Sequence, residues 1–134
     1  MRIKLANAAA GDVANRGLIW CLALAAFLFR TPVALAHAFL DHAAPAVGSS
    51  VASAPAEIKL WFTEQLEPAF SSVEVTDQFG NRVDAGDAKV ARGDATQLEA
   101  RLKPLPPGTY KVIWHVVSAD THRTEGQFTF TVGR

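Results

Sequence analysis

Three residues of this chain, His37, Asp120 and His122, have the types and the spacing of metal ligands. His37 directly follows residues 34–36 (Ala-Leu-Ala), which have the small-x-small pattern at which leader peptidases cut. After such a cut, the α-amino group and the imidazole of His37 would lie on one residue and could chelate one metal ion. An internal histidine cannot do this, because its backbone nitrogen is an amide that serves only as a donor. The cut therefore decides whether His37 supplies one metal donor or two.

Asp120 and His122 form the second part of the predicted site. In an extended segment, side chains at positions i and i+2 point to the same face, about 6.5 Å apart along the chain. Both side chains can then approach one ion. An Asp-x-His pair alone is weak, because short patterns recur by chance and a loop aspartate is usually a turn former. Its combination with an N-terminal histidine in an exported chain strengthens the metal interpretation.

The donor types indicate which metal the site would take. The predicted set is the His37 amine, the His37 imidazole, the His122 imidazole and an Asp120 oxygen. Three nitrogens and one oxygen suit a tetragonal Cu(II) site. Zn(II) prefers a tetrahedral arrangement, which the rigid chelate of one terminal residue makes awkward. Cu(I) favours sulfur, and the single cysteine and the single methionine, Cys21 and Met1, both precede the cut. The residues thus favour a site for Cu(II) alone.

Residues 1–36 have the three parts of an export signal. Arg2, Lys4 and Arg16 form a basic segment, an apolar segment covers residues 18–29, and the small-residue cut follows. This apolar segment is shorter than the roughly 20 residues that cross a bilayer. We therefore predict a signal peptide over 1–36, cleaved before His37, and a soluble, extracytoplasmic domain over 37–134. The alternative is an uncleaved N-terminal anchor.

The charge balance argues against nucleic acid as a partner. The chain has 13 basic and 13 acidic residues, of which four and one lie in residues 1–36, so residues 37–134 carry 9 against 12. The resulting side-chain charge of about −3 does not provide the basic face that nucleic acids need. These 98 residues are enough for one domain. They contain no cysteine, so their core must stabilise the domain without a disulfide.

The segments that must position the three candidate ligands have the pattern of short β-strands. Apolar and polar residues alternate in five runs, which are 58–62, 73–76, 97–102, 110–116 and 128–132. Turn residues separate them, as in 77–81 (Asp-Gln-Phe-Gly-Asn) and the proline-rich 103–108. An all-β chain of about seven strands indicates an antiparallel sandwich or a Greek-key barrel. We expect Trp61, Trp114 and the phenylalanines of the strands and turns to supply most of the core.

Five stretches of the sequence are similar to one known family. They are His37-Ala-Phe-Leu-Asp-His-Ala-Ala-Pro-Ala-Val-Gly, Leu60-Trp-Phe-Thr-Glu, Val75-Thr-Asp-Gln-Phe-Gly, Pro107-Gly-Thr-Tyr and Trp114-His-Val-Val-Ser-Ala-Asp-Thr-His. Together they resemble the CopC family of periplasmic copper-binding and copper-resistance proteins, over nearly all of residues 37–134. The resemblance implies a cupredoxin-like or immunoglobulin-like β-barrel or sandwich in the periplasm, with His37, Asp120 and His122 as Cu(II) ligands. It also implies a CopD-like inner-membrane copper transporter as a partner.

The chain departs from this family in one respect. Some members carry a methionine-rich loop that forms a separate Cu(I) site, and residues 37–134 contain no methionine. The main prediction is therefore a non-enzymatic carrier or buffer for Cu(II) in copper homeostasis or resistance. Two alternatives stay open. One is a copper-dependent oxidase or oxygenase that uses an N-terminal histidine chelate, and the other is a metal-free immunoglobulin-like module for adhesion or assembly.

Five further residues lie close to the candidate ligands in the sequence or share their donor types. Glu64 is expected to be solvated or to support the ligands from outside, and His42 is expected at the surface, although a ligand role stays open for both. His115 is expected to be structural. Ser118 and Thr121 are candidates for orienting Asp120 or His122 through hydrogen bonds.

Overall fold

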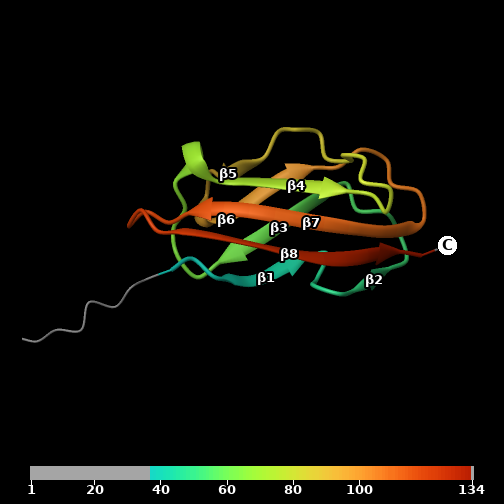
Figure 1. Ribbon diagram of the computed structural model, residues 1–134, viewed down its shortest axis with the longest axis horizontal. Helices are drawn as coiled ribbons and strands as arrows, with labels where there is room; N and C mark the ends of the chain where they lie inside the picture. Colours follow the sequence, from blue (N-terminus) through green and yellow to red (C-terminus); the bar gives the residue numbers. More distant parts are fainter. Residues whose placement is uncertain (1–36, 134) are drawn as a thin grey trace, which may run out of the picture. The chain divides into compact units, whose positions relative to one another are not determined.

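Two four-stranded β-sheets pack face to face in the computed structural model, which describes residues 37–133 (Figure 1). The first sheet has the order β1-β3-β6-β5, with bounds Leu40–Ala44, Glu57–Phe62, Asp94–Arg101 and Lys89–Ala91. The second has the order β2-β8-β7-β4, with bounds Ser50–Val51, Arg123–Val132, Gly108–Val117 and Ser72–Thr76. A short 3-10 helix, η1 (Pro68–Phe70), precedes β4. The predicted signal peptide, residues 1–36, lies outside the described residues.

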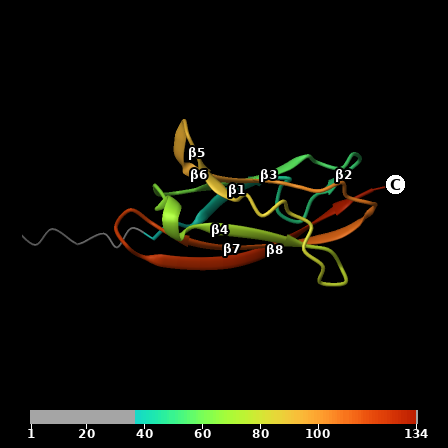
Figure 2. The same cartoon turned by 90° about the horizontal axis from the view of Figure 1, so that it is seen from above.

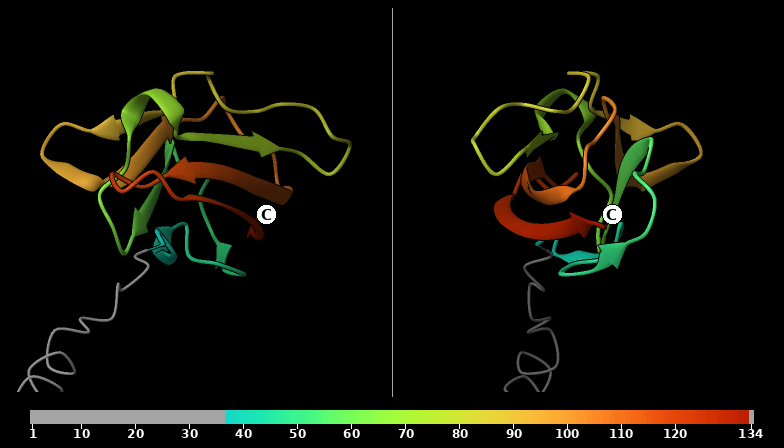
Figure 3. Two further views of the ribbon diagram at one scale, coloured as in Figure 1. Left: turned by 60° about the vertical axis from the view of Figure 1, so that its left-hand side comes forward. Right: turned by 90° about the vertical axis from the view of Figure 1, so that its right-hand side faces the viewer.

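The sandwich alternative is confirmed and the barrel alternative is wrong, because the two sheets are separate and each ends in its own edge strands. Figure 2 shows the two layers from above. Figure 3 adds an oblique view and an end view, in which the β5–β6 hairpin projects beyond the edge of the sandwich. The five alternating runs correspond to β3, β4, β6, β7 and β8. The remaining strands β1, β2 and β5 have five residues or fewer, too short for alternation to identify them.

The core lies between the sheets and follows the period-two alternation of the strands. Ile58, Leu60 and Phe62 of β3 are buried together with Leu98 and Ala100 of β6. The facing sheet contributes these buried residues: Val73, Val75, Tyr110, Val112, Trp114, Val116, Phe128, Phe130 and Val132. The Phe62 ring stands edge-on to the Trp114 ring, with centroids 5.1 Å apart. Gly126 lies opposite Trp114 on β8, where a Cβ atom would overlap the indole.

Three aromatic residues expected in the core lie outside it. Trp61 is half-buried on the outer face of β3, because it alternates with the inward-facing Leu60 and Phe62. Its indole stacks on the His42 imidazole, with ring centroids 4.4 Å apart. Phe70 in η1 and Phe79 in the turn after β4 are 64% and 79% exposed. Burial in this fold therefore depends on strand phase, and an aromatic side chain in a turn does not reach the core.

Two predicted turns are held by side chains. Asp77 Oδ1 accepts hydrogen bonds of 2.9 Å from the backbone nitrogens of Phe79 and Asn81, which closes the turn between β4 and the following loop. The Tyr110 hydroxyl donates to the Pro106 carbonyl and ties the proline-rich segment to the start of β7. Within residues 37–133 the structure has no helix with the length and apolar character needed to cross a membrane.

Candidate metal centre

Residues 37–39, which we call the N-terminal arm, are held by both sheets. Thr63 follows β3, and its hydroxyl donates to the His37 carbonyl at 3.2 Å and accepts from the Phe39 nitrogen at 3.0 Å. The Thr63 nitrogen donates to the Phe39 carbonyl at 2.9 Å. Thr124, near the start of β8, donates to the Ala38 carbonyl at 2.6 Å. The Ala38 side chain is fully buried. His37 therefore projects from a fixed backbone.

Residues 118–122, which we call the hairpin loop, connect β7 to β8 at the same end of the sandwich. The Ser118 nitrogen donates to the His122 carbonyl at 2.9 Å, and the Thr121 nitrogen donates to the Ser118 carbonyl at 2.8 Å. Thr121 has a positive φ of 74°, so the loop reverses direction at this residue. The expectation of an extended Asp-x-His segment is thus wrong. Asp120 and His122 meet because the chain turns between them.

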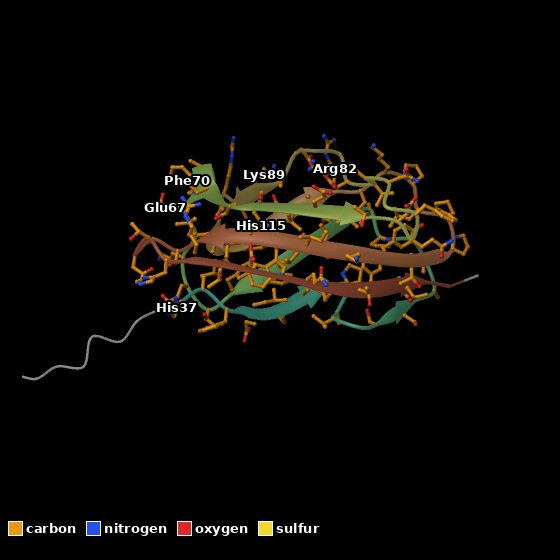
Figure 4. All side chains as sticks on the ribbon, in the orientation of Figure 1. His37, Glu67, Phe70, Arg82, Lys89 and His115 are labelled. Carbon is orange, nitrogen blue, oxygen red and sulfur yellow. The ribbon has the colours of Figure 1, made fainter. Side chains whose placement is uncertain are left out.

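The structure brings the three predicted ligands to one end of the sandwich. The imidazoles of His37 and His122 stand edge to face, with ring centroids 4.7 Å apart. His122 Nδ1 lies 3.0 Å from Asp120 Oδ2, so His122 is the middle member of the group. Figure 4 shows His37 at the end of the sandwich from which the hairpin loop projects.

Asp120 is oriented by the residue at which the hairpin loop begins. The hydroxyl of Ser118, a residue that is 1% exposed, donates to Asp120 Oδ1. This hydrogen bond and the contact with His122 lower the pKa of Asp120 below its ordinary value. The carboxylate is therefore charged at neutral pH and presents negative charge beside His122. The expected orienting role of Ser118 agrees with this geometry, whereas Thr121 acts through its backbone.

One nitrogen of this group lacks a hydrogen bond. His122 Nδ1 is buried, and its close contact with Asp120 does not have hydrogen-bond geometry. A buried polar atom without a hydrogen bond costs free energy in a folded protein and calls for an explanation. A metal ion is one such explanation, since a neutral imidazole nitrogen beside a carboxylate is a suitable donor pair. The residues present therefore fit a metal ion.

The side chains alone do not complete a metal site. Within residues 37–133, no group of three or more His, Cys, Asp or Glu side chains is arranged so that it could hold a metal ion. In the predicted donor set, two of the four donors come from His37, and one of these is a backbone nitrogen. A complete set thus depends on the amine that cleavage before His37 would release.

Comparison with known proteins identifies the family. The family model described as the CopC domain matches residues 40–133. The chain belongs to the CopC family. It is 41% identical over 118 residues to protein YobA from Escherichia coli strain K12, which covers 87% of this chain and 95% of YobA.

Two solved structures of CopC-family proteins have the same fold. The crystal structure of CopC from Methylosinus trichosporium OB3b is 36% identical, with a TM-score of 0.68, over 72% of this chain and 94% of that one. The structure of PcoC, a methionine-rich copper resistance protein from Escherichia coli, is 38% identical, with a TM-score of 0.61, over 72% and 99%. The fold and the family prediction are therefore confirmed.

The other candidate residues of this CopC-family chain have different surroundings. His42 is exposed, stacks on Trp61, and has its Nδ1 atom 2.8 Å from Asp41 Oδ2. His115 is exposed on the outer face of β7, with Nε2 3.3 Å from Glu125 Oε2. Glu64 is half-buried next to Thr63.

Sequence reasoning missed Thr63 and Thr124, the residues that hold the N-terminal arm. Thr63 directly follows β3 and Thr124 lies in β8. Threonine is common in and near strands because its side chain is β-branched. Nothing in the local pattern distinguishes such a threonine from one whose hydroxyl bonds a distant segment.

Proposed function

We propose that residues 37–134 bind Cu(II) outside the cytoplasm and act as a copper carrier or buffer in copper homeostasis or resistance. Membership of the CopC family supports this proposal, as does the similarity to PcoC, a copper resistance protein. The leader-like residues 1–36 support export, and the family resemblance favours the periplasm. Copper is the cargo of such a protein, and binding without chemistry is the proposed activity.

The proposed ligands are His37, through its amine and its imidazole, together with Asp120 and His122. The observation that carries the proposal is the buried His122 Nδ1 atom, which has no hydrogen bond and lies 3.0 Å from Asp120 Oδ2, beside the His37 ring. The His37 ring, the His122 ring and the Asp120 carboxylate thus lie in the same small region, which supports the proposal. Copper bound there would give this nitrogen a ligand bond in place of its contact with Asp120.

The proposed oxidation state follows from the donor chemistry. Nitrogen and carboxylate oxygen are suited to Cu(II), whereas Cu(I) favours thiolate and thioether sulfur. PcoC is a methionine-rich protein, while residues 37–134 of this chain contain neither methionine nor cysteine. We therefore propose a Cu(II)-only site without a second Cu(I) site.

A carrier role is also favoured by the charge of Asp120. A carboxylate held in its charged form stabilises Cu(II) over Cu(I), which opposes the redox cycling that an oxidase needs. A carrier needs a protein to exchange copper with, and we propose a CopD-like copper transporter of the inner membrane as that partner.

The test begins with the exported protein. A mass that corresponds to a chain starting at His37, followed by a nitrogen-rich type 2 EPR spectrum on Cu(II) addition, is the expected result. A matched chain with one alanine added before His37 should bind Cu(II) at least about 100-fold more weakly, because the amine is then displaced from the chelate. Equal Cu(II) affinity of the two chains would overturn the proposed site.

Titration at several pH values provides a second test. Imidazole and α-amino groups ordinarily gain protons between about pH 8 and pH 6, and protonated nitrogens cannot bind metal. Isothermal titration should therefore show Cu(II) affinity falling steadily across this range. An affinity independent of pH would contradict a site built on these nitrogens.

A further inference from the structure

The backbone of the N-terminal arm is fixed more firmly than a chain end usually is. The first residues of most domains are poorly ordered unless other groups hold them. If the chain is cut before His37, the residue that supplies two proposed copper donors becomes the end of the chain. Any disorder of residues 37–39 would then have to be lost when copper binds, which would weaken binding.

Two threonine hydroxyls hold this arm, one from each sheet. Thr63 follows β3 and contacts both His37 and Phe39 through its hydroxyl, at 3.2 and 3.0 Å. Thr124 on β8 contacts the Ala38 carbonyl at 2.6 Å. All three hydrogen bonds go to backbone atoms of the arm, so they fix its path whichever side chains it carries. The arm is thereby held across the open end of the sandwich.

Thr124 also connects the arm to the hairpin loop. It lies two residues after His122, at the beginning of the strand that leaves the loop. A hydrogen bond from Thr124 to Ala38 therefore fixes the distance between the arm and the segment that carries Asp120 and His122. In this arrangement the imidazoles of His37 and His122 are neighbours, with centroids 4.7 Å apart.

We infer that Thr63 and Thr124 are positioning residues, whose hydroxyls hold the N-terminal arm so that both donors of His37 face His122 and Asp120. The inference rests on the proposed Cu(II) site and adds to it the groups that organise it before copper arrives. Neither threonine binds the metal. Their contribution is to remove the cost of ordering the chain end, which is how preorganised sites gain affinity.

The test uses the mature chain with Thr63→Val and Thr124→Val, which keep the side-chain shape and remove the hydroxyl. Thr124→Val should lower Cu(II) affinity by about 3- to 10-fold, the usual effect of one hydrogen bond, and Thr63→Val, which removes two, should lower it at least as much. Competition with a Cu(II) chelator measures the affinity. The EPR spectrum should become heterogeneous, because an unfixed arm presents the chelate in several arrangements. Thr63→Ser and Thr124→Ser should restore both the affinity and the single spectrum.

Two controls separate positioning from a general effect on folding. Thr131→Val removes a hydroxyl contact with Thr109, of 3.3 Å, at the far end of the same strand β8, and should leave Cu(II) affinity unchanged. In the chain with one alanine before His37, the valine changes should cause no further loss, because the threonines act only through His37. Hydrogen exchange of the Phe39 amide should accelerate in Thr63→Val, whose hydroxyl accepts from that amide.

The outcomes distinguish the inference from the proposed function. If the mature chain binds Cu(II) and the added alanine weakens binding, but the valine variants match the unchanged chain in affinity and spectrum, the positioning inference is wrong. It is equally wrong if the valine changes weaken binding as much in the extended chain, since their effect would then not pass through His37. If the mature chain itself binds no Cu(II), the proposed function fails, and the inference fails with it.

Discussion

Asp84 and Asp120 are both held by hydrogen bonds from neighbouring residues, but they lie near opposite ends of the sandwich and differ in what they leave free. Asp84 is 2% exposed and accepts from the Val75 and Gly86 nitrogens and from Arg82 Nε, at 2.9, 3.0 and 3.0 Å. Burial alone would raise the pKa of Asp84, but these donors together lower it. Its carboxylate thus has partners from its own chain on both oxygens.

Asp120 is arranged differently. Its side chain is 40% exposed, and one of its oxygens lies beside a buried imidazole nitrogen that has no hydrogen bond. A cluster whose polar groups are all satisfied stabilises the fold, whereas a cluster that leaves a donor or acceptor without a partner can bind something else. The comparison predicts that changes near Asp84 alter the free energy of unfolding and that changes near Asp120 alter copper binding.

The largest expected effect on stability is that of Asp84→Ala. The change leaves the buried Val75 nitrogen without its acceptor and removes the closer of the two acids beside Arg82, and we expect the free energy of unfolding to fall by about 2–4 kcal/mol. Denaturant unfolding of the copper-free chain measures it. Asp120→Ala is the matched control and should lower the free energy of unfolding far less, as is usual for an exposed carboxylate. Similar losses for the two variants would remove the distinction between the two ends.

The next largest effect is expected at the other end. His122→Ala removes a proposed ligand and should weaken Cu(II) binding at least about 100-fold, which corresponds to about 2.7 kcal/mol. The stability of the copper-free chain should change much less, because the variant loses only the contact of His122 with the exposed carboxylate of Asp120. Chelator competition and denaturant unfolding give the two quantities. Retained affinity in His122→Ala would exclude this residue as a ligand.

A change between the two ends tests whether they are independent. In Gly126→Ala, the new Cβ atom overlaps the Trp114 indole, and the crowding should lower the free energy of unfolding by about 1–3 kcal/mol. The Cu(II) affinity of the folded variant should remain that of the unchanged chain. An altered affinity would mean that packing near Trp114 controls the hairpin loop.

The smallest expected effect is a gradual loss of stability in acid. The pKa of Asp84 is lowered in the folded chain, so its contribution is fully present above the ordinary carboxyl pKa of about 3.9 and is lost as pH falls through the lower folded value. Unfolding of the copper-free chain at pH 2 to 6 should show this loss. Asp84→Asn should lack that part of the pH dependence, and an identical pH profile in the variant would contradict the assignment.

The residue pattern predicted much of the fold and a coherent candidate site. Alternation located β3, β4, β6, β7 and β8, since each is long enough to show which residues face inward. It did not locate β1, β2 and β5, whose few residues pair along edges. The types of His37, Asp120 and His122 selected candidates that the fold does bring together, although their role as copper ligands stays a prediction.

The sequence by itself determined the donor types, the strand phases and the membership of the CopC family. Only the tertiary structure decided that the Trp61 indole stacks on His42, that the hairpin loop turns at Thr121, and that His122 Nδ1 is left without a hydrogen bond. The physical reason is distance along the chain. Strand phase repeats every two residues, whereas the hydrogen bonds that place His37 join residues 24, 26 and 86 positions apart.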